Sequence, residues 1–165
     1  MRSADFVMLA LQLATMVGCA VLFGQIMRHF RQPAAVVTPV NPWSWSEGFG
    51  YEQANLVEGA TRTLYCAGQT SVDADGNPVH VADVTAQLEM ALDNLEAVLA
   101  KASMSLGDVV RLNYFTTDLE AFFAGYERIV ARLRAAGARP AGTLVQVTRL
   151  ALPGLMVELE ATASQ

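Results

Sequence analysis

The sequence predicts an α/β domain in which two helices cover one face of a mixed β-sheet. Two long stretches carry apolar residues at intervals of three and four, which is the period of an amphipathic helix. Short β-rich runs bounded by glycine, proline and aspartate surround them. The expected order is β, β, α, β, α, β, β, with one more edge strand near 36–40. A chain of 165 residues has room for one such domain but not for two of ordinary size.

Five β-rich runs are expected to form the body of the sheet. A single turn-like segment separates the first two, so we expect them to pair as a hairpin that opens the domain. The last run alternates apolar with mostly acidic or polar residues, which is typical of a strand buried on one face. The runs lie at 51–58, 63–68, 108–116, 143–150 and 155–162.

Both helices carry start and stop signals. Asp83 is the expected N-cap of the first helix, which should end between 102 and 105. Asp118 is the expected N-cap of the second, and Gly137 followed by Pro140 should stop it.

Two helices can cover only one face of the sheet. We expect the opposite face to carry apolar side chains, with Leu144 and Met156 as candidates. An apolar patch of this size is seldom left in water. The sequence therefore predicts self-association.

The N-terminal part differs from the rest. Phe6 to Met27 contains no charged residue and is long enough to cross a bilayer. Basic residues follow it, so an anchor here would leave the domain in the cytoplasm, and no small-x-small cleavage site of a removed signal peptide follows. Alternatively, Met27 is the true start. We therefore divide the chain into an apolar segment with a linker, 1–37, and a domain, 38–165.

Composition argues against several classes of partner. The formal charge is −5 and the charges are interspersed, so no basic stripe suggests nucleic acid. Cys19 and Cys66 lie in unlike contexts, which does not indicate a disulfide framework and favours a reducing, cytoplasmic location for the domain. His29 and His80 lack metal-ligand spacing. We expect no metal and no cofactor, and Cys66 is expected to be a small buried residue.

Several short motifs are spread over nearly the whole chain after Thr38. They are Phe49-Gly-Tyr-Glu-Gln-Ala54, Cys66-Ala-Gly-Gln69, Asp93-Asn-Leu-Glu-Ala-Val-Leu99, Gly107-Asp-Val-Val-Arg111 with Phe115-Thr-Thr-Asp-Leu119, and Val157-Glu-Leu-Glu-Ala161. In sequence and order these motifs resemble the Rid (YjgF-like) family of reactive-intermediate deaminases. The resemblance implies a chorismate-mutase-like α/β sandwich, a homotrimer with small-molecule pockets between subunits, and hydrolysis of imines or enamines.

One departure from the family pattern concerns its pocket arginine. Active members have a P-A-R-[ST] sequence whose arginine pairs with the substrate carboxylate. Here the segment is Arg139-Pro-Ala-Gly-Thr143, so Gly142 occupies the position of that planar, bidentate donor. Arg139 is either a solvated loop residue or a substitute on a rebuilt loop. Gly142, Thr143 and Arg139 are candidate ligand-binding residues.

The resemblance implies further site residues. Tyr51 and Glu158 match the pocket tyrosine and the glutamate near the reacting water, and together they could position a water for proton transfer. Alternatively, Tyr51 is a strand aromatic and Glu158 a surface acid. Gly68 matches the glycine whose backbone approaches the ligand. Tyr126 stands where the family has an asparagine and could line the cleft or the core.

Trp43 and Trp45 stand two residues apart in a Pro/Ser-rich stretch. In an extended segment both indoles would lie on one side. They either wall the cleft or pin the N-terminal strand to the sheet.

Three functions stay open. The first is a trimer that binds a small metabolite without ordinary 2-imino acid deaminase activity. The second is an imine or enamine deaminase of altered specificity, and the third is a membrane-tethered structural or regulatory assembly.

Overall fold

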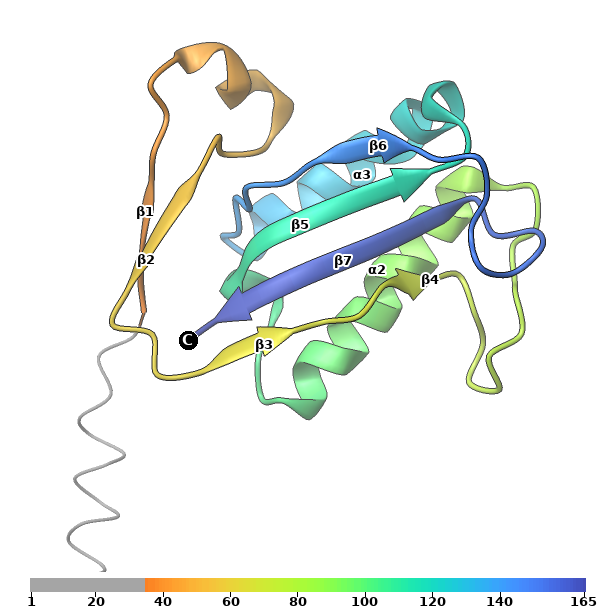
Figure 1. The fold of residues 1–165 in the computed structure, drawn as a ribbon, viewed down its shortest axis with the longest axis horizontal. Helices are drawn as coiled ribbons and strands as arrows, with labels where there is room; N and C mark the ends of the chain where they lie inside the picture. The colour runs from red at the N-terminus through yellow and green to blue at the C-terminus, as the bar shows by residue number, and fades with distance from the viewer. Residues whose placement is uncertain (1–34) are drawn as a thin grey trace, which may run out of the picture. The chain divides into compact units, whose positions relative to one another are not determined.

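The computed structural model describes residues 35–165, which form two β-sheets and two long helices (Figure 1). The main sheet has five strands in the order β3-β7-β5-β6, with β4 also pairing with β7, and β1 and β2 form a separate two-stranded ribbon. Along the chain the elements are β1 (Val36–Pro39), the 3-10 helix η1 (Ser44–Phe49), β2 (Asn55–Glu58), β3 (Thr63–Tyr65), β4 (Gln69–Thr70), α2 (Val84–Lys101), the 3-10 helix η2 (Leu106–Asp108), β5 (Val109–Thr116), α3 (Leu119–Ala135), β6 (Leu144–Gln146) and β7 (Val157–Ser164).

The two helices begin at the expected N-caps. A side-chain oxygen of Asp83 accepts a hydrogen bond from the backbone N–H of Ala86 at 3.0 Å. Asp118 caps α3 in the same way through Ala121, also at 3.0 Å. These bonds satisfy backbone donors that the first turn of a helix leaves without a partner. Gly137, with φ of +76°, follows the end of α3 as expected.

Both helices pack on the same face of the main sheet (Figure 1). The apolar stripes of α2 and α3 meet alternate residues of β5 and β7, and each fully buried leucine contributes roughly 1.5 to 3 kcal/mol. Cys66 belongs to this core as a small buried residue, and burial raises the pKa of its thiol. The largest fully buried apolar side chains are Leu88, Leu92, Leu95, Leu99, Leu112, Phe122, Ile129, Leu133, Val157 and Leu159.

The prediction that the runs 51–58 and 63–68 pair with each other as an opening hairpin is wrong. β2 pairs antiparallel with β1, while β3 pairs antiparallel with the C-terminal part of β7. The segment before β3 is held at the chain end, because the backbone N–H of Arg62 donates to the carbonyl of Gln165 at 3.1 Å. Pairing with β7 also places Leu64 against the core. A turn-like segment in the sequence carries no information about a strand that is distant in sequence, so it cannot show that β3 pairs with β7 and not with β2.

The prediction that Leu144 and Met156 lie on the uncovered face of the sheet is also wrong. Leu144 and Met156 pack against the core, and Leu144 stands beside Tyr114 on the helix side. The open face instead carries Phe115, Val145 and Tyr65, the last of which is 81% exposed. It is still partly apolar. The α/β class with two helices on one face is confirmed.

Within residues 35–165, no helix is long and apolar enough to span a membrane. The predicted anchor at Phe6 to Met27 lies outside the described residues and stays a prediction.

Candidate functional site

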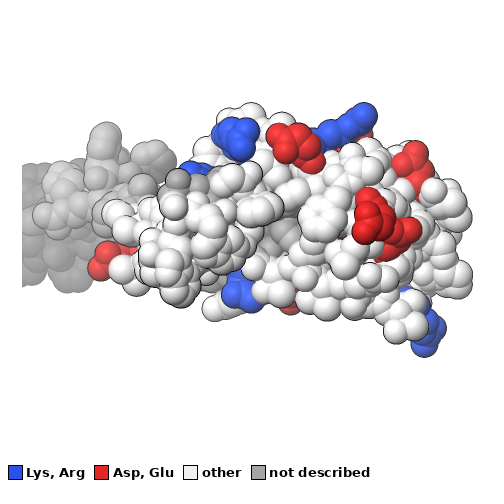
Figure 2. All heavy atoms as spheres, turned by 90° about the horizontal axis from the view of Figure 1, so that it is seen from above, with Lys and Arg blue, Asp and Glu red and all other residues white. Residues whose placement is uncertain are grey.

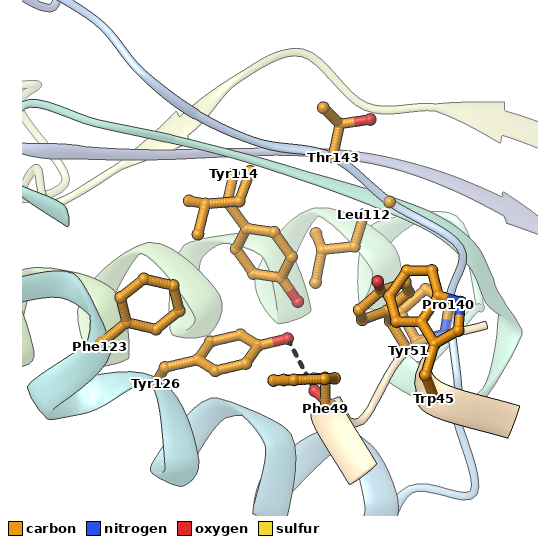
Figure 3. A pocket seen from close by; sticks show the side chains of 11 residues that line it. Trp45, Phe49, Tyr51, Leu112, Tyr114, Phe123, Tyr126, Pro140 and Thr143 are labelled. Carbon is orange, nitrogen blue, oxygen red and sulfur yellow. Dashed lines mark hydrogen bonds between the residues drawn. The ribbon is translucent and has the colours of Figure 1, made fainter. Parts of the chain in front are cut away.

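An aromatic cavity of about 300 Å³ lies among η1, the loop after it, α3 and the start of β6 (Figure 3). Among the described residues that line it, none carries a charged group. Six aromatic side chains form most of its wall. The lining residues are Trp45, Phe49, Tyr51, Leu112, Tyr114, Phe123, Tyr126, Pro140, Gly142, Thr143 and Leu144.

One wall depends on a close approach between the η1 loop and α3. Gly50 ends η1 with φ of +81°, and a Cβ there would lie 2.6 Å from a methyl carbon of Val130 on α3. Glycine permits both the backbone conformation and the contact. It thereby places Phe49 and Tyr51 at the cavity. The ring of Tyr51 meets that of Trp45 edge-on, with centroids 6.3 Å apart.

Two phenols form the inner part of the cavity. Tyr114 on β5 is buried, and its ring stands nearly perpendicular to that of Tyr126 at a centroid distance of 5.6 Å. The Tyr126 hydroxyl donates to the carbonyl oxygen of Phe49 at 3.4 Å (dashed in Figure 3). Burial is the main cause that raises the pKa of both phenols, that of Tyr114 well above its ordinary value. Both hydroxyls are therefore neutral at physiological pH.

Gly142 closes the cavity with backbone alone. The flanking carbonyls are held by β5, since the N–H of Leu112 donates to Ala141 at 2.9 Å and the N–H of Tyr114 donates to Thr143 at 2.8 Å. A Cβ at residue 142 would lie 2.0 Å from the carbonyl oxygen of Leu112. No side chain can be added there without moving the backbone. Thr143 lines the cavity too, but its side chain points away from the rings (Figure 3).

Arg139 does not line the cavity. Its Nε lies 2.6 Å from Oε1 of Glu52, a carboxylate only 2% exposed. The side-chain amide of Asn41 also donates to this carboxylate. The guanidinium is therefore neither a free loop group nor a substitute in the cavity, because it neutralises a buried charge that would otherwise be costly. No pattern in the sequence marks Glu52 as a buried partner of this arginine.

Glu158 and Gly68 form a second group. Residues 157 and 159 of β7 are buried against the helices, so Glu158 between them faces the open side of the sheet. An added Cβ at Gly68 would lie 1.6 Å from Oε1 of Glu158, so the carboxylate rests against the glycine backbone. Neither residue lines the cavity. Within one chain, Tyr51 and Glu158 are not brought together.

The two tryptophans separate. Trp45 lines the cavity, whereas Trp43 is 63% exposed and does not. η1 begins directly after Trp43, so the segment is not extended and the indoles do not share a side. Sequence reasoning also missed Phe49 and Phe123. Phe123 stands one helical turn before Tyr126, which was a usable signal.

Comparison with known proteins decides the family. A model of the endoribonuclease L-PSP family, which includes the YjgF, RutC and Rid proteins, matches residues 49–165. The chain belongs to this family. Protein DfrA of Myxococcus xanthus is 39% identical over 114 residues, which is 68% of this chain and 83% of that protein.

Two further Rid relatives are informative. The 2-iminobutanoate/2-iminopropanoate deaminase of Escherichia coli is 36% identical over 103 residues, or 61% of this chain and 77% of the enzyme. The Rid protein YyfB of Yersinia pestis superposes with a TM-score of 0.71 at 34% identity, covering 81% of this chain and 100% of that one. The expected YjgF-like fold is thereby confirmed.

Proposed function

We propose that this chain forms a Rid-type homotrimer that binds a small metabolite in clefts between subunits and does not deaminate ordinary 2-imino acids. The observation that carries the proposal is the backbone at Gly142. The arginine that Rid deaminases are expected to use would start from this residue, yet even a methyl group would collide with the Leu112 carbonyl at 2.0 Å.

No lysine or arginine among residues 35–165 lines the cavity. Arg139 is the arginine closest in sequence to Gly142, and its guanidinium is bound to Glu52. A carboxylate that entered an aromatic cavity would lose its hydration without gaining a partner. Loss of a buried charge-pair contact costs about 2 to 5 kcal/mol of binding, which is enough to abolish recognition of a small anion.

The open sheet face supports the trimer. Phe115, Val145 and Tyr65 give it apolar area that a partner subunit would cover. Glu158 and Gly68 lie on the same side of the sheet. Because Tyr51 faces the aromatic cavity, a site that uses both Tyr51 and Glu158 requires a second subunit.

The charge distribution bears on the word endoribonuclease in the family name. Figure 2 shows acidic and basic side chains spread over one face with uncharged surface between them. The formal charge is −5, and no histidine among residues 35–165 lines the cavity. A surface that grips phosphates needs clustered basic groups. We therefore do not propose ribonuclease activity or a nucleic-acid partner.

Two other functions remain as alternatives. An imine or enamine deaminase of altered specificity is favoured by the named activity of the E. coli relative. A membrane-tethered assembly, with the domain in the cytoplasm, depends on Phe6 to Met27. Fractionation of the native protein into membrane and soluble pools tests the tether.

The deaminase question is tested by ammonia release. An amino-acid oxidase generates 2-iminobutanoate or 2-iminopropanoate in the presence of this protein or of the E. coli relative as a positive control. We expect release at the uncatalysed rate with this protein and acceleration with the control. Acceleration by this protein that disappears in Arg139→Ala would contradict the proposal and support the alternative deaminase.

A further inference from the structure

We propose that the ligand of the aromatic cavity is a neutral, planar aromatic or heteroaromatic molecule with one hydrogen-bond acceptor. This inference rests on the proposed function, because it names the ligand class of the same cavity.

Ring geometry is the first argument. Trp45 and Tyr51 stand together on one wall, while Phe123 and Tyr126 stand on another (Figure 3). Within each pair the rings are steeply inclined, at 71° for the first and 89° for the second. Walls of this kind offer both faces and edges to a third ring, and aromatic pairs gain energy in stacked or edge-on contacts beyond the area they bury. A cavity of about 300 Å³ suits a molecule of one or two rings.

The absence of charge is the second argument. None of the described lining residues is ionisable except the tyrosines, and burial raises the pKa of Tyr114 and Tyr126 further above neutrality. Among the described lining residues of one chain, an anion would therefore find no counter-ion. A cation would face the rings, but would meet no carboxylate among these same residues. A neutral ligand enters with the smallest loss of hydration.

The third argument is the hydroxyl of Tyr51 at the cavity wall. The Tyr126 hydroxyl is engaged with the carbonyl of Phe49. Within residues 35–165, the Tyr51 hydroxyl makes no hydrogen bond. It can donate to an acceptor on the ligand, such as an amide carbonyl, and so fix the ligand's orientation.

Three probes that share one ring separate the charge classes. Isothermal titration calorimetry of the full chain would use benzamide, benzoate and benzylamine. We expect benzamide to bind at least about tenfold more tightly than benzoate, because the carboxylate is desolvated without a partner. Tyr51→Phe should weaken benzamide binding about three- to tenfold, the effect of one hydrogen bond.

The two tryptophans give a matched control. Trp45→Ala should weaken benzamide binding about tenfold or more, whereas Trp43→Ala should leave it unchanged, because Trp43 does not line the cavity. In a Trp43→Phe chain, Trp45 is the sole tryptophan, because the sequence has 2 tryptophans. Its emission should shift on binding. Both side chains are more than half exposed, so neither change should unfold the domain.

Several outcomes would overturn the inference. They are tightest binding of benzoate, tightest binding of benzylamine, no binding of any probe at millimolar concentration, or insensitivity to Trp45→Ala. The proposed function fails separately. If ammonia release is uncatalysed but benzamide does not bind, only this inference is lost. If benzamide binds as expected but imino acids are deaminated, only the proposed function is lost.

Discussion

Gly142 borders the cavity with backbone alone, because the carbonyl of Leu112 occupies the space that a side chain would need. A Cβ at this residue would lie 2.0 Å from a backbone oxygen, so the neighbouring strand would have to move. We expect Gly142→Ala to lower the free energy of unfolding by about 1 to 3 kcal/mol, the usual cost of overpacking. Urea denaturation followed by circular dichroism measures this change.

Gly48→Ala is the matched control. A Cβ at Gly48 would meet no atom within 4 Å, and its φ is not positive. The free energy of unfolding of the Gly48→Ala chain should stay within about 0.5 kcal/mol of that of the parent chain. Equal stability of the Gly142→Ala chain and the parent would show that β5 can shift freely. A side chain at residue 142 would then be possible.

The match to family motifs predicted more of the residues that line the cavity than the chemistry of single side chains did. Tyr51, Tyr126, Gly142 and Thr143 were named from the sequence, and all four line the cavity. The partner of Arg139 could not be predicted. A charged residue in an extended segment is ordinarily exposed, and only the tertiary fold buries Glu52 beside that guanidinium.

At the element scale, Gln87 holds α2 to two loops. This buried side chain donates to the carbonyls of His80 and Gly154, at 3.1 and 2.8 Å, and accepts from the N–H of Met156 at 2.7 Å. Gln87→Leu would remove all three bonds and leave the carbonyl of Gly154 and the N–H of Met156 without a partner among the described residues, whereas the carbonyl of His80 would keep the N–H of Asp83 at 3.0 Å. We expect it to lower the free energy of unfolding by about 2 to 4 kcal/mol, measured by urea denaturation.

The same substitution at an exposed site is the control. The side-chain amide of Gln146 donates to the carbonyl of Thr117 at 3.2 Å, and this side chain is exposed. Gln146→Leu should cost less than about 1 kcal/mol. Similar losses for the two variants would show that Gln87 is not a specific tie between α2 and the loops.

Helices were predictable because their signals are local. A capping aspartate and a spacing of three and four fixed α2 and α3 closely. Strand partners were less predictable. The sequence signals for β2 and β3 permit a hairpin, and the choice of β1 and β7 as partners depends on burial across the whole sheet.

The apolar side chains on the open face of the main sheet lead us to predict how many chains associate. Val145 is 41% exposed and stands beside Phe115 on that face. Val145→Glu would place a charge in the proposed subunit contact. We expect sedimentation velocity to show a parent species of three 17.7 kDa chains and a Val145→Glu chain that dissociates.

Leu152→Glu is the control for assembly. Leu152 is 42% exposed but lies in the loop before β7 rather than on the open face. The Leu152→Glu substitution should leave the sedimentation coefficient of the parent species unchanged. A monomeric parent chain, or a Val145→Glu chain that still associates, would contradict the proposed trimer.

We propose that this chain does not recognise a carboxylate in its cavity, because the residue aligned with the family's arginine is Gly142 and Arg139 is held by Glu52. Calorimetric titration with 2-oxobutanoate, a stable analogue of 2-iminobutanoate, tests this most directly. We predict no binding at millimolar concentration by the parent chain or by Arg139→Ala. Micromolar affinity that Arg139→Ala removes would contradict this proposal, since it would show that the guanidinium leaves Glu52 to bind the ligand.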